Sequence, residues 1–305
     1  MTQPLVSVVI SHYGTTEYLK FCLDSVIKQS YKTLEIILTM DRPDPESLDW
    51  IYRSYADSRL KVYSEVGIGL VQNLNYGVRH AQGKYIVRMD SDDIMMPNRI
   101  SKQVNFLENK PAYGAVGGGV IQIDEDNKEI KRIYYPHRNY LAKLRLSASS
   151  PIAHPALTVR QVVMEEVGGY LEEEFPAEDF GLLTRMGVNW KIGNLKEQVI
   201  YHRIHHNSVS ARLSEAQLKK TLSVIESNSG SIKMLLKLGT NRSTLHSSKT
   251  GKMRYTLSLS PKKATKFFLY LLISLLPKFM IYLGNHRIKS KRDSSLVEIE
   301  KGKHV

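Results

Sequence analysis

Apolar, strand-like runs alternate with helical patterns through the first third of the chain. Such an alternation, in units of about thirty residues, predicts a parallel sheet with right-handed crossovers and helices on its faces. We therefore expect an α/β domain whose ligand lies at the carboxyl ends of the strands. The expected strands are residues 5–10, 34–39, 60–63 and 85–89, and the expected helices are residues 16–29 (capped by Thr15 or Thr16), 45–55 and 70–80.

Acidic residues follow two of these expected strands. Asp41 comes after the second, and Asp90, Asp92 and Asp93 come directly after the fourth. Three neighbouring carboxylates repel one another, so at least one would take up a proton unless a cation lies among them. Oxygen ligands that share a metal ion with substrate phosphates favour Mg²⁺ or Mn²⁺. We expect a divalent metal site here; the alternative is that Asp92 or Asp93 caps a helix that begins near Pro97.

The pattern changes after residue 115, and we find no internal repeat. A second acidic stretch, residues 172–179, runs into a helical pattern, and the last apolar run is followed by a polar loop at 205–210. The expected elements of this half are a hairpin of residues 116–123 and 128–135 around a turn at 124–127, helices at 139–146, 161–167 and 180–186, a strand ending at Arg160, and a last strand at 199–204.

The net charge of +13 is concentrated at the carboxyl-terminal end of the sequence. Residues 231–305 contain 16 Lys and Arg but 3 Asp and Glu, which accounts for the whole excess, so residues 1–230 are neutral. A nucleic-acid binder that used this region would interleave aromatic with basic residues, whereas the aromatic residues here lie in one apolar block. We therefore expect no nucleic-acid partner, and a basic region that contacts an anionic surface.

The apolar block, residues 267–283, is flanked by basic residues and interrupted by Pro277. As one helix it would span about 25 Å, less than the roughly 30 Å hydrocarbon core of a bilayer. We expect residues 211–305 to form a helical, basic extension in which this block contacts anionic lipid without crossing the membrane. The alternative is a pair of helices packed against the main domain or against another subunit.

Cys22 is the only cysteine in the sequence, so the chain forms no disulfide within itself, and a reducing compartment is expected. The start of the sequence has no basic segment ahead of an apolar one, and residues 6–10 are better explained as a first strand than as a signal peptide. Together with the basic extension, these features predict a cytoplasmic protein that binds peripherally to the cytoplasmic face of the membrane.

Four separated stretches carry motifs that occur together in one family. They are residues 6–41, with Leu19, Leu23, Ser25, Gln29 and Asp41; Met89–Asp93, with Pro97, Arg99 and Gln103; His154–Pro155, Gly168–Tyr170 and Glu178–Asp179; and Tyr201–Ser210. In this order and at this spacing, they resemble the family 2 glycosyltransferases, over about residues 4–210. The resemblance implies the GT-A fold, which has a Rossmann-like, mainly parallel central sheet flanked by helices. It also implies a catalytic domain at residues 1–210, with a nucleotide-sugar-binding half at 1–110 and an acceptor-binding half at 111–210.

The same resemblance implies an inverting transfer of one sugar from a nucleotide-sugar, most often a UDP-sugar, to a saccharide or lipid-linked saccharide in cell-surface polysaccharide synthesis. A single transfer is implied because the closing loop lacks the Gln-x-x-Arg-Trp motif of processive synthases. Asp179 is the implied general base, and Glu178 beside it would raise its pKa if both were buried. His154 is implied on the acceptor side. The alternative for Glu178 and Asp179 is a solvated acidic run before a helix.

The implied donor site combines the two groups of strand-end acids with the closing loop. A metal ion there would stabilise the charge that develops on the leaving nucleoside diphosphate. A competing hypothesis, a nucleotidyltransferase that makes sugar nucleotides, would need a Gly-rich, basic loop after the first strand, and residues 11–16 have neither feature. The implied roles are nucleoside contacts for Asp41 and Ser11, diphosphate contacts for Arg203 and His205, Mn²⁺ or Mg²⁺ binding by Asp92 and Asp90, and metal binding or support for Asp93.

Overall fold

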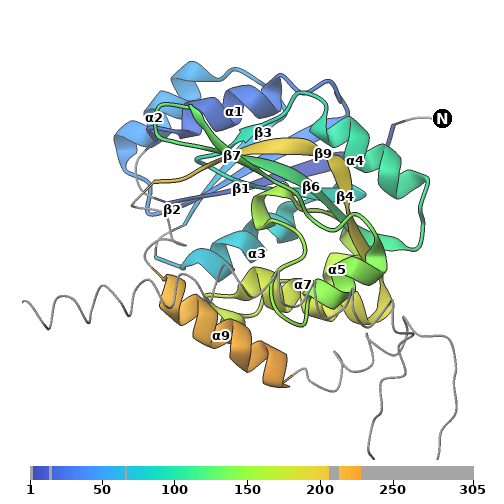
Figure 1. The fold of residues 1–305 in the computed structure, drawn as a ribbon. Coiled ribbons are helices and arrows are strands. Elements are labelled where there is room, and N and C mark those ends of the chain that lie inside the picture. The colour runs from blue at the N-terminus through green and yellow to red at the C-terminus, as the bar shows by residue number, and fades with distance from the viewer. Residues whose placement is uncertain (1–2, 14–15, 66, 206–212, 228–305) are drawn as a thin grey trace, which may run out of the picture. The chain divides into compact units, whose positions relative to one another are not determined.

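The computed structural model describes residues 3–13, 16–65, 67–205 and 213–227, which form a mixed α/β fold (Figure 1). Within these residues, nine strands make one sheet in the order β3-β2-β1-β4-β8-β6-β9-β5, with β7 paired to β6. The strands are β1 (Val6–Tyr13), β2 (Leu34–Asp41), β3 (Leu60–Glu65), β4 (Tyr85–Asp90), β5 (Ile94–Met95), β6 (Tyr113–Ile123), β7 (Glu129–Ile133), β8 (Thr158–Arg160) and β9 (Lys191–Arg203). The helices are α1 (Leu19–Ile27), α2 (Pro45–Ser54), α3 (Leu70–His80), α4 (Arg99–Glu108), α5 (Asn139–Arg145), α6 (Gln161–Glu166), α7 (Glu178–Asn189) and α9 (Ser214–Ser227).

Strands β1 to β4 are parallel to one another, as the alternation of strands and helices predicts. The register sets Tyr13 of β1 beside Asp41 of β2, and Ser11 of β1 beside Asp90 of β4. The carboxyl ends of these three strands therefore meet at one edge of the sheet. The expectation that Asp41 and the acidic residues after β4 lie at such ends is confirmed.

Alternating side chains of β1 enter two hydrophobic cores, one on each face of the sheet. Val8 and Ile10 pack with α1, α2 and α4, whereas Val9 packs with α3, α6 and α7. Figure 1 shows α1 and α2 on one side of the sheet and α3 on the other. Burying each of these side chains contributes about 1.5–3 kcal/mol to folding, so both faces fix the strand whose end forms the site.

Two helices begin later in the structure than the sequence predicts. α4 begins at Arg99 with Asn98 before it and no side-chain cap, so the alternative that Asp92 or Asp93 caps this helix is wrong. α1 begins at Leu19 rather than after Thr16, again without a side-chain cap. The residue before α1 is Tyr18, whose ring lies under the Arg203 guanidinium, 4.3 Å from ring centre to Cζ. The residue directly before α1 is thus held by a contact with a distant residue, which local sequence patterns do not show.

Strand β9 begins earlier than the apolar pattern predicts. It starts at Lys191 rather than at Val199 and pairs in parallel with β6. Its first half is polar, but the buried Asn194 donates through Nδ2 to the carbonyl oxygens of Pro136 and Pro151, both at 2.9 Å. Hydrogen bonds to distant residues thus satisfy the Nδ2 donor of a polar side chain inside the sheet, a feature that hydrophobic alternation cannot reveal.

Part of the predicted carboxyl-terminal extension lies in the described residues. Helix α9 contacts α7, and its Thr221 and Val224 are buried. In the described ranges, no helix is both long enough and apolar enough to span a membrane. The apolar block at residues 267–283 lies outside the described residues, so its expected lipid contact stays a prediction.

Candidate active site

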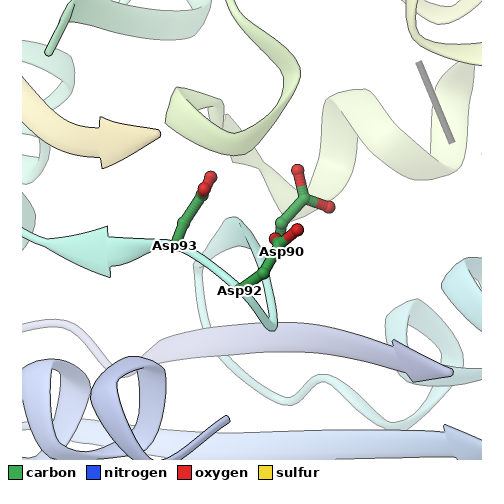
Figure 2. A group of neighbouring side chains, drawn as sticks. All are labelled: Asp90, Asp92 and Asp93. Carbon is green, nitrogen blue, oxygen red and sulfur yellow. The ribbon is translucent and has the colours of Figure 1, made fainter. Parts of the chain in front are cut away.

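Three carboxylates converge where β4 ends and the chain turns into β5. One oxygen from each of Asp90, Asp92 and Asp93 lies within 4.8 Å of the others, and Figure 2 shows the three side chains at this turn. We call these residues the acidic triad. Asp90 and Asp92 are half-buried, whereas Asp93 is fully buried. The turn is fixed because β5 pairs with the end of β9.

Two members of the acidic triad have basic partners. The Arg88 guanidinium forms an ion pair with Asp90 through Nη2 and Oδ1. On the other side of the triad, Nε2 of His205 lies 2.9 Å from Oδ2 of Asp92. Strand β4 and the segment that follows β9 therefore each bring one basic side chain to the triad.

Asp93 carries the strongest electrostatic cost of the triad. Its Oδ1 accepts a hydrogen bond from the Arg203 backbone N–H at 2.8 Å, but its Oδ2 is buried without a hydrogen-bond partner. Burial, and then the charges of Asp92 and Asp90, raise the pKa of this carboxyl well above its ordinary value. A divalent cation would relieve both the repulsion and the unpaired oxygen. The all-carboxylate donor set therefore fits Mg²⁺ or Mn²⁺.

A cavity of about 390 Å³ opens beside the triad, at the ends of β1 and β2. Asp41 is held there because its two carboxylate oxygens accept from the backbone N–H groups of Gly67 and Gly69, at 2.6 and 3.0 Å. The cavity reaches the triad through Ser11, which neighbours Asp90 in the sheet. Its lining residues are Ser11, Tyr13, Asp41, Gly69, Leu70, Asn73, Phe175 and Leu213.

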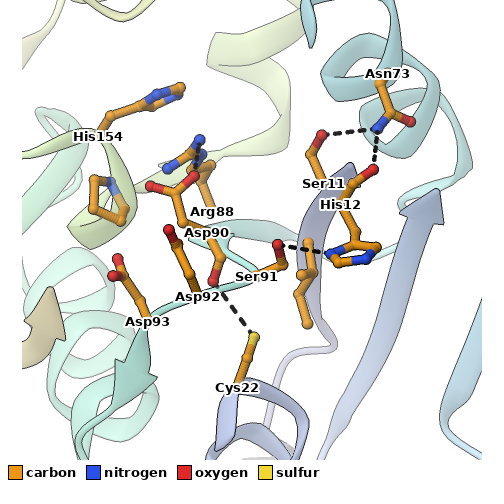
Figure 3. Close-up of polar contacts among 12 residues, drawn as sticks. Ser11, His12, Cys22, Asn73, Arg88, Asp90, Ser91, Asp92, Asp93 and His154 are labelled. Atoms are coloured by element: carbon orange, nitrogen blue, oxygen red, sulfur yellow. Dashed lines mark hydrogen bonds and ion pairs between the residues drawn. The ribbon is translucent and has the colours of Figure 1, made fainter. Parts of the chain in front are cut away.

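Asn73 is a cavity residue that the sequence analysis missed. Its Nδ2 donates to the Ser11 hydroxyl at 2.9 Å, as Figure 3 shows, while its Oδ1 is buried without a partner. The signal was an amide on the buried face of α3, between the apolar Val71 and Leu74. A buried amide usually has a hydrogen-bonding reason for its position.

A second acidic site begins α7. Glu178 is buried and its Oε2 has no hydrogen-bond partner. Burial, followed by the charge of Asp179, raises the pKa of Glu178 to about 7. Asp179 accepts a hydrogen bond from the Ser150 hydroxyl at 3.0 Å, and burial raises its pKa as well. The alternative of a solvated acidic run is therefore wrong for this pair, which we call the acid pair.

His154 and Tyr170 lie on the same side of the site as the acid pair. Nε2 of His154 is 2.9 Å from the Tyr170 hydroxyl. Burial, and then the positive charge of Arg88, lower the pKa of His154 well below its ordinary value, so the imidazole is neutral at pH 7. Burial, and to a smaller extent the charges of Glu178 and Asp179, raise the pKa of Tyr170. The structure thus brings the predicted acceptor-side residues together, and adds Ser150 and Tyr170, which the sequence analysis did not single out.

Arg203 has a different environment from the one predicted. It is 1% exposed, and its guanidinium donates to the backbone carbonyls of Asp92, Asp124 and Glu125 and to the Asn127 side chain, at 2.7–3.1 Å. The predicted contact between Arg203 and the diphosphate needs correction, because these hydrogen bonds occupy N–H groups of the guanidinium. Arg203 instead ties the triad to the turn between β6 and β7. The closing loop at 206–212 lies outside the described residues.

The chain is similar to known proteins of one family. Residues 7–168 match the family model described as glycosyl transferase family 2. The O-antigen biosynthesis glycosyltransferase WbnJ of Escherichia coli is 30% identical over 241 residues, which cover 76% of this chain and 89% of that protein. The amylovoran biosynthesis glycosyltransferase AmsE of Erwinia amylovora is 30% identical over 214 residues, or 68% of this chain and 79% of the relative.

Solved structures are similar in fold at lower sequence identity. S. aureus TarS 1–349 in complex with UDP-GlcNAc has a TM-score of 0.60 at 16% identity, covering 76% of this chain and 70% of that chain. The mannosyltransferase PcManGT from Pyrobaculum calidifontis, in complex with GDP-Man and Mn²⁺, has a TM-score of 0.54 at 17% identity. The match covers 91% of this chain and 87% of that chain. At these identities the similarity concerns the fold alone, and it is the GT-A fold that the sequence predicts.

Proposed function

This chain belongs to glycosyl transferase family 2, and from that premise we propose that it transfers one sugar, with inversion, from a UDP-sugar to a saccharide or lipid-linked saccharide acceptor. As a glycosyltransferase it is not the nucleotidyltransferase of the competing hypothesis. Relatives named for O-antigen and amylovoran biosynthesis support a role in cell-surface polysaccharide synthesis. The observation that carries the proposal is the acidic triad, which is linked to the cavity through Ser11 beside Asp90 and to the buried acid pair through Arg88.

The nucleoside would occupy the cavity at the ends of β1 and β2. Asp41 offers carboxylate lone pairs for the N–H of the base or for a ribose hydroxyl, and Ser11 and Asn73 add polar atoms to the same wall. A volume of about 390 Å³ lies at the lower end of the roughly 300–1,000 Å³ range of ligand pockets. This volume is large enough for a nucleoside, and UDP-bound TarS, which shares the fold, supports uracil as the base.

The diphosphate would then lie on the triad. Asp92 and Asp90 would hold the Mn²⁺ or Mg²⁺ ion, with Asp93 joining or supporting them, and His205 would keep the Asp92 carboxylate in place. When bound, such an ion neutralises the diphosphate and stabilises charge on the leaving group. This order along the donor would direct the sugar away from the cavity and toward the acid pair.

Asp179 would be the general base that takes the proton of the acceptor hydroxyl as that oxygen attacks the anomeric carbon. The Ser150 hydroxyl donates to Oδ2 of Asp179 at 3.0 Å and so helps to fix the orientation of this carboxylate. Displacement from the face opposite the leaving group inverts the anomeric configuration. The neutral His154, which contacts the Tyr170 hydroxyl, would form a hydrogen bond with the same saccharide acceptor.

The proposed domain division follows from these placements. Residues 1–110 supply most of the cavity and the whole triad, and 111–210 supply the acid pair, Ser150 and His154. Residues 211–305 are the proposed extension, whose basic, apolar block would bind anionic lipid on the cytoplasmic face, near a lipid-linked acceptor.

Flotation with vesicles containing phosphatidylglycerol tests the proposed lipid contact: the full chain should float and a chain ending at Ser260 should not. Equal behaviour of the two chains would contradict the lipid contact.

A donor screen tests the proposed activity. We expect the protein to hydrolyse at least one UDP-sugar slowly in the presence of Mn²⁺, and to stop when EDTA is added. UDP-glucose, UDP-galactose and their N-acetylated analogues form the panel, and the corresponding GDP-sugars test the choice of base. A protein that binds neither UDP nor any of these donors would contradict the proposal.

A further inference from the structure

Arg88 is a buried cation whose hydrogen-bonding capacity is only partly used. It is 4% exposed, and it lies in a strand, β4, whose preceding residues are apolar. Its backbone N–H donates to the carbonyl oxygen of Leu157 at 2.9 Å, which fixes the main chain. Its Nη2 pairs with Asp90, but Nε and Nη1 are buried with no hydrogen-bond partner. Leaving such N–H groups unpaired in the interior is costly, so a ligand that supplies acceptors would stabilise them.

The position of Arg88 identifies which part of the donor could reach it. One side of its guanidinium contacts Asp90 of the triad, and Figure 3 shows the group beside that carboxylate with His154 nearby. Burial raises the pKa of both Glu178 and Asp179, and the charge of Arg88 opposes that rise, so Arg88 also lies within electrostatic range of the acid pair. It is not among the residues that line the nucleoside cavity. Arg88 therefore lies beyond the diphosphate position, where the proposed arrangement puts the sugar.

The unpaired groups at this position have complementary chemistry. The free N–H groups of Arg88 can only donate, whereas the free Oε2 of Glu178 is an acceptor when the carboxyl is ionised. A sugar hydroxyl can accept from the one and donate to the other. Hydroxyls on neighbouring ring carbons thus match what this part of the site lacks.

We propose that Arg88 binds hydroxyl groups of the sugar being transferred and so helps to determine which sugar the enzyme accepts. This inference rests on the proposed function, because it assumes a UDP-sugar bound between the cavity and the acid pair. It differs from a purely structural role, in which Arg88 would only hold Asp90 in place for the metal.

Arg88→Lys separates these roles. Lysine keeps a positive charge beside Asp90 but lacks the planar group that carries Nε and Nη1. Calorimetric titrations in Mn²⁺ would compare UDP with UDP-glucose, UDP-galactose and their N-acetylated analogues. We expect the Kd of UDP to stay within about twofold of the wild-type value, while the ratio of the UDP-sugar Kd to the UDP Kd rises about tenfold for the preferred sugar, as loss of one or two hydrogen bonds predicts.

Arg160→Lys is the matched control. Arg160 pairs with Tyr85 at the opposite end of β4, and its guanidinium donates to the Tyr113 carbonyl at 2.8 Å. The Arg160→Lys variant should alter thermal stability as Arg88→Lys does, but it should leave the ratio of the UDP-sugar Kd to the UDP Kd unchanged.

Two results would overturn the inference. One is an unchanged Kd ratio in a folded Arg88→Lys protein, and the other is an equal loss of affinity for UDP and for UDP-sugars, which would assign Arg88 to the diphosphate or to Asp90. A wild-type protein that binds no UDP is a distinct result, because it would overturn the proposed function itself.

Discussion

The acidic triad and the acid pair use the same kind of side chain in opposite electrostatic settings. Two of the three triad carboxylates have a basic side chain beside them, Arg88 or His205, and the three lie close enough to share a metal ion. The acid pair has no such cation in direct contact among the described residues, and burial raises the pKa of both its members. This contrast is consistent with the proposed roles, in which the triad binds a metal ion and the acid pair takes up a proton.

Removing a proposed metal ligand should have the largest effect. Asp92→Ala deletes one of the converging carboxylates and the partner of His205. We expect the rate of metal-dependent UDP-sugar hydrolysis to fall by roughly 10³-fold, because the leaving diphosphate loses its charge stabilisation. Asp49→Ala, which removes an exposed acid from α2, is the control and should be near wild type. Full activity of Asp92→Ala would remove the triad from the mechanism.

Changing the proposed general base should affect transfer but not donor binding. Asp179→Asn keeps the size of the side chain and removes its ability to take a proton. We expect transfer to an acceptor to fall by about 10²–10⁴-fold, while the Kd of UDP in Mn²⁺ stays within about twofold. Glu173→Gln, in the exposed part of the same acidic stretch, serves as the control. A comparable loss of UDP affinity would mean that Asp179 supports the donor site instead.

The smallest effect concerns the pH dependence of stability. Glu178 has a pKa of about 7 in the folded chain, above its ordinary 4.5, so the folded protein binds a proton that the unfolded chain has released. The contribution of this group to folding therefore falls as the pH rises from 4.5 to 7 and is constant above that range.

Glu178→Gln should remove this dependence. Between about pH 5 and about pH 8, the wild-type free energy of unfolding should fall by up to about 3 kcal/mol more than that of the variant. Urea denaturation in EDTA measures both. Identical pH dependence would show that Glu178 is not held protonated by burial.

The first half of the fold and the place of the triad follow from local sequence patterns. Each of β1, β2 and β4 is an apolar run, and parallel strands must end at the same edge, so Asp41 and Asp90 could be placed together without a structure. Helix α3 covers residues 70–80, as the sequence predicts, because its apolar residues recur at helical spacing.

The remaining features depend on contacts between distant residues. The polar first half of β9 is a strand because Asn194 finds two carbonyls more than 40 residues away. Arg203 is a structural residue because the turn at 124–127 offers it carbonyl oxygens. Nothing in the sequence near Arg88 indicates that two of its N–H groups are buried without partners. Such features require the tertiary structure, whereas periodicity reports only which face of an element is buried.

The most direct test of the account is a crystal structure of the protein grown with Mn²⁺ and UDP. We expect anomalous scattering from Mn²⁺ within bonding distance of the Asp92 carboxylate, with the diphosphate on the ion and uracil in the cavity beside Asp41. Manganese bound away from the acidic triad, or uridine bound outside that cavity, would contradict the account.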